Sequence, residues 1–154
     1  MEVTFMVEPF KEAFGEADAL MAKHWEEIAR NKHLLVLNPD VERYEIMEKK
    51  GDLLLVTARS AGALVGYFLW VLGTHSHYKD VLVAEEDLHY LTPECRLGLI
   101  GYNFMKFSRQ AALDRGAKLL VVREKLGHEH PALMKRLGYM PTEIAYTYSA
   151  KEGV

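Results

Sequence analysis

Three side chains that could accept a proton stand at alternate positions of one short run, VAEEDLHYL. Glu85, Asp87 and His89 follow one another in steps of two, and successive side chains of a strand point to opposite faces. The spacing therefore predicts that these three share one face, with Glu86 and Tyr90 on the other. Carboxylates and imidazoles gathered in this way can act as general bases. The alternative is a solvated strand end with no chemical role.

The loop PECRLGLIG, shortly after this run, has the composition of an anion-binding site. Arg96 offers a charged donor, while Gly98 and Gly101 permit close backbone approach or a positive φ. The loop leads into an expected helix over 102–115, and the first N–H groups of a helix lack partners and attract negative charge. We expect a phosphate-bearing ligand here. The alternative is that the glycines serve only a tight turn and close packing.

The elements that must position these residues follow from hydrophobic periodicity and turn residues. We expect strands over 3–7, 53–59, 64–72, 81–90, 118–123 and 140–149, and helices over 10–31, 39–50, 102–115 and 131–137. Asn38, Pro39 and Asp40 suit a helix start, Gly51 suits its end, and 73–79 is expected to be a polar loop. A hairpin followed by a strand–helix–strand crossover predicts an α/β fold of three layers with a mixed sheet, in one domain over 1–154.

The bulk composition bounds the class of protein. A chain of 154 residues with 49% hydrophobic and 27% charged residues suits one soluble domain with its own core. The net charge of −3 gives no reason to expect nucleic acid or an anionic membrane as a partner. A single cysteine, Cys95, excludes an intrachain disulfide framework, and no signal peptide or membrane-spanning run is recognisable. A cytoplasmic location is expected.

The histidines raise the question of a metal. His75 and His77 are spaced like zinc ligands, and His128 and His130 repeat that spacing. A zinc site needs a third and usually a fourth ligand, and the chain has no second cysteine to help supply them. We therefore expect no metal. Cys95 is not expected to be a nucleophile, because no partner His–Asn or His–Asp arrangement is recognisable.

PECRLGLIG resembles the pyrophosphate loop of the GNAT N-acetyltransferase superfamily, which has Gln or Arg, two residues, Gly, one residue, then Gly or Ala. Arg96 matches the first position and Gly101 the last, whereas Leu99 replaces the middle glycine and Gly98 lies one residue earlier. Three further stretches resemble the family in the correct order: RSAGALVGYFL, RGAKLLVV and HPALMKRLGY. Together they cover about 53–148. AEED before the loop and HP before the expected helix over 131–137 are most similar to phage-encoded members.

The resemblance implies a GNAT-like fold, a mixed and mainly antiparallel sheet flanked by about four helices. It also implies acetyl-CoA as cosubstrate, with its pantetheine arm between the fourth and fifth strands against main-chain groups of His89 and Leu91. The pyrophosphate would be held by the loop and the start of the helix. These cofactor-binding residues are Arg96, Leu97, Gly98, Leu99, Gly101 and Tyr102.

The implied function is transfer of an acetyl group to a primary amine of a small molecule or protein. An ammonium group must lose a proton before it attacks, and we expect Glu85, or else Asp87, to be the base. The family often has a Tyr in the fourth helix to protonate the leaving thiolate, but Met134 stands there; Tyr139, Tyr146 or water could substitute. The alternative is a GNAT-fold protein without chemistry that acts as a binding or virion-associated protein. An exposed final strand would offer an edge for a homodimer.

Overall fold

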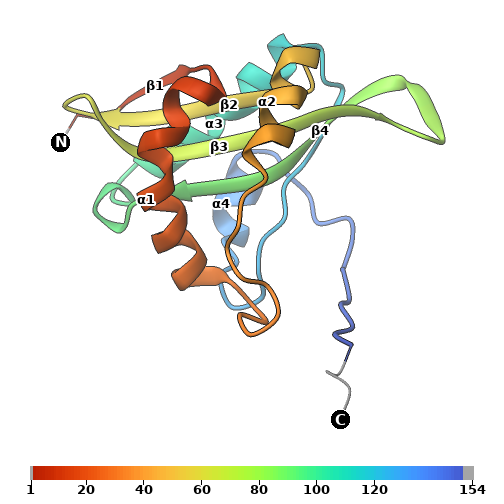
Figure 1. Cartoon of the computed structure of the whole chain (residues 1–154). Coiled ribbons are helices and arrows are strands. Elements are labelled where there is room, and N and C mark those ends of the chain that lie inside the picture. Colours follow the sequence, from red (N-terminus) through yellow and green to blue (C-terminus); the bar gives the residue numbers. More distant parts are fainter. Residues whose placement is uncertain (1, 151–154) are drawn as a thin grey trace.

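The computed structural model describes residues 2–150 and contains one five-stranded sheet in the order β1-β2-β3-β4-β5 (Figure 1). The strands are β1 Thr4–Val7, β2 Leu53–Ser60, β3 Ala63–His75, β4 Tyr78–Leu91 and β5 Leu119–Val121. The first four strands pair antiparallel, and β4 pairs parallel with β5. A parallel pair needs a crossover, and the chain supplies it with a helix.

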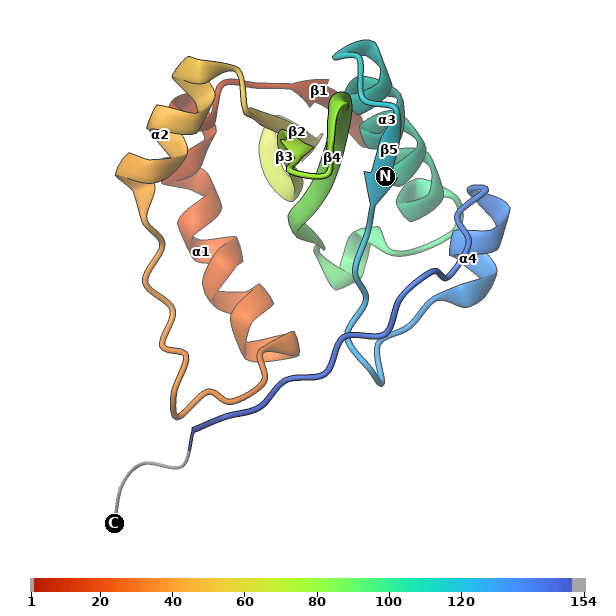
Figure 2. The ribbon, with the colours of Figure 1, turned by 90° about the vertical axis from the view of Figure 1, so that its right-hand side faces the viewer.

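Helices cover both faces of this sheet (Figure 2). They are α1 Phe10–Ile28, α2 Val41–Lys50, α3 Ile100–Asp114 and α4 Pro131–Arg136, with a short 3-10 turn, η1, over Pro93–Cys95. In Figure 2, α1 and α2 lie on one side of the sheet while α3 and α4 lie on the other. The three-layer α/β architecture with a mixed sheet is therefore confirmed.

Local sequence explains where several elements begin and end. The Asp40 side chain accepts a hydrogen bond from the Arg43 amide at 3.0 Å, so Asp40, rather than Asn38, caps α2. Gly51, with φ of 81°, ends the helix in the left-handed region that glycine adopts without strain. The expected hairpin of β2 and β3 turns through Ala61 and Gly62, both at positive φ.

Each face of the sheet has its own core. Phe68, Trp70 and Phe104 belong to the core that α3 and α4 cover, and the Trp70 Nε1 donates to Ser108 Oγ at 2.8 Å. Leu55, Tyr67 and Leu69 belong to the core on the other face, which α1 and α2 cover. Because directly opposed residues of paired strands share a face, alternation along β3 also fixes which face each paired residue of β4 occupies.

Two expectations about strands were wrong. The expected strand over 140–149 has no regular secondary structure, and Ile144, Tyr146 and Tyr148 are 77%, 91% and 90% exposed. An alternating pattern makes a strand only where a partner edge pairs with it, and this segment leaves α4 and runs away from the sheet (Figure 1). The expected homodimer contact through this strand therefore has no strand edge in the structure to form it. The loop expected over 73–79 is instead a tight turn, because β3 and β4 both continue into it.

Candidate active site

Strands β4 and β5 stay together for only a short distance. Their pairing consists of Val83 with Leu119, Ala84 with Leu120 and Glu85 with Val121, after which β4 continues alone to Leu91. We call the place where the pairing ends the fork. Beyond the fork, the edge of β4 that β5 had covered faces no other strand of the sheet. An extended ligand could pair with this edge as a strand would.

A series of free backbone donors runs from the segment before α3 into the first turn of that helix. Within residues 2–150, the amides of Leu97, Gly98, Leu99, Gly101 and Tyr102 donate no hydrogen bond. We call residues 97–102 the amide loop. The N-cap of α3 has no side chain that bonds these amides, and a Cβ added at either glycine would meet no atom within 4 Å. The loop therefore presents open, unpaired N–H groups at the positive end of a helix.

Arg96 is not directed at the amide loop. Its guanidinium bonds both carboxylate oxygens of Glu27 in α1, and its Nε donates to the Leu91 carbonyl at 2.7 Å. The same guanidinium lies 5.2 Å from the Tyr90 ring centroid. The partner of Arg96 in this structure is thus a carboxylate, and its expected role as a phosphate ligand stays a prediction.

A second arginine contacts the amide loop through the ring of Tyr102. Arg136 of α4 lies over the ring of Tyr102, 4.6 Å from the centroid. It adds positive charge beside the free amides, because Tyr102 belongs to the loop. The sequence held no signal for this contact, since the two residues come from separate helices.

A β-bulge overturns the expected faces of β4. Leu69 pairs with Leu88 but Trp70 pairs with Glu86, so Asp87 is an extra residue in the ladder. Directly opposed residues share a face. Glu86 and His89, opposite Trp70 and Phe68, therefore face α3 and α4, whereas Glu85 and Asp87 face α1 and α2. His89 does not share a face with the two expected bases, and Tyr90 does not share one with Glu86.

The two expected bases already have partners. Glu85 accepts from the Arg123 guanidinium at 2.7 Å, and both side chains are about half exposed. Asp87 accepts from the Tyr44 hydroxyl of α2 at 2.6 Å. Burial, together with this hydrogen bond, raises the pKa of Tyr44, so the hydroxyl stays protonated and donates.

A third carboxylate, which sequence reasoning passed over, lies at the fork itself. Glu86 has a side chain only 8% exposed and bonds both His89 Nδ1 and the Arg123 amide. Glu86 thus joins β4 to the segment that follows β5 where their pairing ends. The sequence places three acids side by side, and nothing in it marks this one as the buried member.

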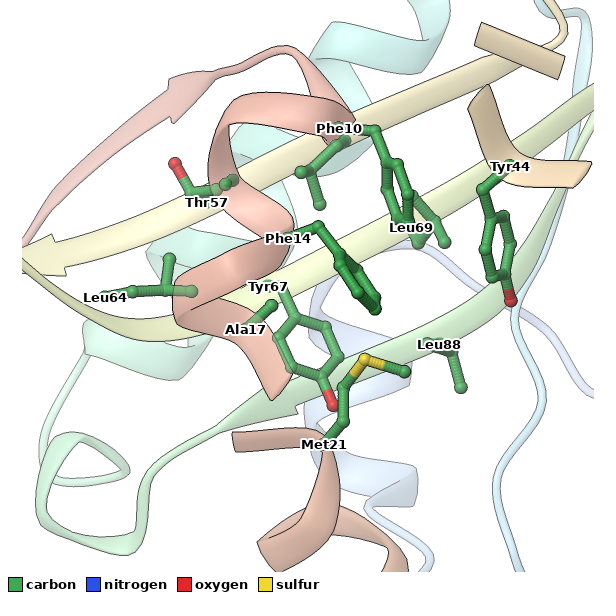
Figure 3. A pocket seen from close by; sticks show the side chains of 12 residues that line it. Phe10, Phe14, Ala17, Met21, Tyr44, Thr57, Leu64, Tyr67, Leu69 and Leu88 are labelled. Atoms are coloured by element: carbon green, nitrogen blue, oxygen red, sulfur yellow. The ribbon is translucent and has the colours of Figure 1, made fainter. Parts of the chain in front are cut away.

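The face of β4 toward α1 and α2 has an apolar floor (Figure 3). A cavity of about 20 Å³ lies between α1, α2 and the sheet, with Phe14, Met21, Tyr44 and Leu88 among its lining residues. Room of this size holds about one water-sized group. The cavity is therefore a packing gap between the helices and the sheet and is too small to hold a whole substrate.

One buried histidine sits close by. His24 of α1 is hydrogen-bonded to the Tyr67 hydroxyl at 2.8 Å and stacks on Tyr90 at 5.0 Å between ring centroids. Burial first, and then the nearby charge of His89, lowers the pKa of His24 to about 4. A neutral His24 is therefore part of the folded state at neutral pH.

Met134 stands at the position where GNAT enzymes often have a Tyr that protonates the leaving thiolate, and its side chain is part of the packing. Met134 lies against the core on the α3–α4 side, as does Tyr139. Burial raises the pKa of Tyr139 to about 12, which keeps its phenol protonated. Of the substitutes for the missing Tyr, Tyr146 lies in the exposed tail. No group of three or more His, Cys, Asp or Glu side chains within residues 2–150 is arranged to hold a metal ion, and none of the helices there could cross a membrane.

Comparison of the whole chain with solved structures identifies the fold. A ribosomal-protein-alanine N-acetyltransferase from Brucella melitensis biovar Abortus 2308 superposes with a TM-score of 0.72 and 17% identity, covering 99% of each chain. A predicted acetyltransferase from Clostridium acetobutylicum, solved with acetyl-CoA, gives 0.68 and 13% over 96% of each chain. This protein has the GNAT acetyltransferase fold.

The likeness extends across diverse members of that fold. Glucosamine-6-phosphate N-acetyltransferase from Arabidopsis thaliana superposes with a TM-score of 0.72 at 9% identity, over 98% of this chain and 100% of that one. No protein-family model and no curated protein matches the sequence. The fold predicted from the amide loop and its flanking motifs is confirmed, and the GNAT fold by itself does not fix an acceptor.

Proposed function

We propose that this protein transfers the acetyl group of acetyl-CoA to a primary amine. The observation that carries the proposal is the row of free amides in the amide loop, next to an edge of β4 that β5 leaves unpaired. Phosphate oxygens accept hydrogen bonds, so five amides without acceptors fit a pyrophosphate. The solved GNAT-fold structure with acetyl-CoA supports the same ligand.

In this proposal the chain's own residues bind and orient. The amide loop holds the pyrophosphate, and main-chain groups near His89 and Leu91 pair with the pantetheine arm along the free edge of β4. Acetyl-CoA supplies an activated thioester. Glu85 and Asp87, the bases expected from sequence, lie on the face of β4 toward α1 and α2, and Glu86 and His89 lie on the face toward α3 and α4.

The amide loop gives a direct test by calorimetric titration with acetyl-CoA. Gly101→Glu fills the open position and places a negative charge beside the pyrophosphate, so affinity should fall at least about 100-fold. Gly15→Glu is a matched control, because Gly15 also lies in a helix with no atom within 4 Å of an added Cβ. The control should bind as the wild type does.

Two outcomes would contradict the proposal. Normal binding by Gly101→Glu would show that the pyrophosphate is not held by the amide loop. A wild-type protein that binds no acetyl-CoA would favour the alternative from the sequence analysis, a GNAT-fold protein that has no catalytic activity and acts by binding. Acceptors can then be screened by thiol release, beginning with a peptide that starts with alanine and with glucosamine 6-phosphate, after the names of the two relatives.

A further inference from the structure

The Glu86 carboxylate spans the fork. Its Oε1 lies 3.0 Å from His89 Nδ1 on the same strand, and its Oε2 accepts from the Arg123 amide at 3.1 Å, just after β5. The Glu86 side chain is 8% exposed, and its two oxygens engage two different partners, so the carboxylate has little freedom to turn. Glu86 is therefore fixed in place, and it fixes the ring of His89.

The ring of His89 is held from a second direction. It stacks on Phe68 with 5.2 Å between ring centroids and 16° between planes. A carboxylate can only accept hydrogen bonds, so His89 Nδ1 carries a proton, and in the neutral ring Nε2 then keeps its lone pair. Nε2 has no hydrogen-bond partner within residues 2–150, and the side chain is 34% exposed. A substrate can therefore reach an oriented imidazole with a free accepting nitrogen.

The two acids expected to act as base lack this freedom. Glu85 is bonded to the Arg123 guanidinium, and Asp87 to the Tyr44 hydroxyl. A proton accepted by either carboxylate would compete with a donor already bound there. His89 pairs with its acid in the arrangement by which a carboxylate orients a catalytic imidazole.

We propose that His89, oriented by Glu86, is the general base that deprotonates the acceptor amine, an inference that rests on the acetyltransferase function proposed above. An N–H bond of the ammonium breaks and its proton goes to Nε2, where Glu86 stabilises the imidazolium. The amine lone pair then forms a bond to the thioester carbonyl carbon, and the C–S bond breaks. A proton of the attacking nitrogen passes to the departing thiolate, and the imidazolium releases its proton to solvent.

The charged and titratable groups around His89 suit this role. Glu86 stabilises positive charge on the ring, while the Arg123 guanidinium, from the segment after β5, is itself neutralised by Glu85. His24 of α1 is the other nearby base, and burial lowers its pKa to about 4. His24 is therefore neutral at working pH and does not repel an imidazolium at His89. Phe68, from β3, contributes only an apolar surface.

The test compares single variants in one assay. His89→Gln removes the base, Glu86→Gln keeps the shape and removes the charge, and Glu85→Gln and Asp87→Asn address the rival assignment. His75→Gln, at the end of β3 next to the β3–β4 turn, is the control for replacing a histidine. Thiol release is measured across pH with the two acceptors named above, or as slow acetyl-CoA hydrolysis where neither is used. Calorimetry gives the Kd for acetyl-CoA.

We expect His89→Gln to lower kcat by about 100-fold or more with little change in Kd. Glu86→Gln should move the acidic limb of the pH–rate profile to lower pH, because the imidazolium loses its partner; a merely structural role would leave that limb in place. Wild-type kcat and pH profile in His89→Gln, or the main loss in Glu85→Gln or Asp87→Asn, would overturn the assignment. A wild type that binds acetyl-CoA and releases no thiol would overturn it as well.

Nitrogen-15 NMR of the histidine rings tests the geometry without turnover. The wild type should show His89 protonated on Nδ1 and not on Nε2, and Glu86→Gln should mix the two tautomers. The opposite tautomer in the wild type would overturn the proposal even if catalysis is found. Failure of the wild type to bind acetyl-CoA would instead refute the proposed function, whatever the tautomer.

Discussion

The guanidinium of Arg96 and the carboxylate of Glu27 form a two-pronged ion pair, with Nη1–Oε1 at 2.6 Å and Nη2–Oε2 at 2.8 Å. The pair ties the last turns of α1 to the segment that leads into the amide loop. Because Arg96 Nε also bonds the Leu91 carbonyl, one side chain connects α1, the end of β4 and the loop. Arg96 thus has a structural task whether or not a phosphate reaches it.

Glu27→Gln should lower the free energy of unfolding by about 1 kcal/mol at neutral pH, as expected for a partly exposed bidentate pair. The hydrogen bond from Arg96 lowers the pKa of Glu27 below its ordinary value of 4.5. The stabilisation is therefore complete above that pH and is lost as pH falls through the lowered pKa. Urea unfolding at several pH values measures this. Glu26→Gln is the matched control, since the Glu26–Lys32 pair is more exposed. Equal effects of both variants would contradict the assignment.

Gly66→Ala should destabilise the protein by about 2 kcal/mol. A Cβ at Gly66 would lie 2.8 Å from the Tyr90 carbonyl oxygen and 2.8 Å from Leu91 Cδ1, and the backbone oxygen cannot move without shifting β4. Gly73→Ala, in the same strand, meets no atom within 4 Å and should have a small effect. Urea unfolding measures the free energy of unfolding of both variants. Similar free energies would show that the backbone of β4 can shift at this point at little cost.

His24 should make stability depend on pH. Its pKa falls from 6.5 in the unfolded chain to about 4 in the folded state, so the folded protein resists its protonation. The stabilisation is complete above pH 6.5 and is lost progressively as pH falls toward about 4, a change of about 3 kcal/mol. His24→Gln keeps a hydrogen-bonding partner for Tyr67 and removes the titration. The free energy of unfolding of the variant should therefore fall less over this range than that of the wild type. Parallel curves would refute the prediction.

Removal of residues 142–154 should change the free energy of unfolding by no more than about 0.5 kcal/mol. Ile144, Tyr146 and Tyr148 are almost fully exposed, so their loss removes little buried area. Thermal and urea unfolding of the shortened chain provide the measurement. A loss of several kcal/mol would mean that the segment packs on the domain in solution.

Much of the architecture could be predicted because it depends on near neighbours in the chain. Asp40 and Gly51 bound α2 through contacts within one turn, and the β2–β3 hairpin is specified by its own glycine turn. The loop before α3 was recognisable for the same reason, since Arg96, Gly98 and Gly101 stand together in one short stretch just before an expected helix. The order of these elements was enough to predict a three-layer α/β domain, and the resemblance of PECRLGLIG and its flanking motifs to a known family predicted the GNAT fold.

The candidate base could not be predicted in this way. Period-two alternation placed His89 with Glu85 and Asp87, and the bulge at Asp87 moved it to the opposite face. A bulge depends on the register against β3, and an isolated strand sequence carries no record of that register. The final strand failed for a related reason, because alternation does not supply a partner edge.

The sequence by itself determined most of the elements, their order and the amide loop, because local propensity, capping and turn chemistry act over a few residues. Only the tertiary structure decided which charges meet. Glu27 reaches Arg96 across 69 positions, Glu86 reaches the Arg123 amide across 37, and Arg136 lies over Tyr102 from another helix. Such pairs form when packed layers bring distant segments within a few ångströms, and that distance is set by the fold as a whole.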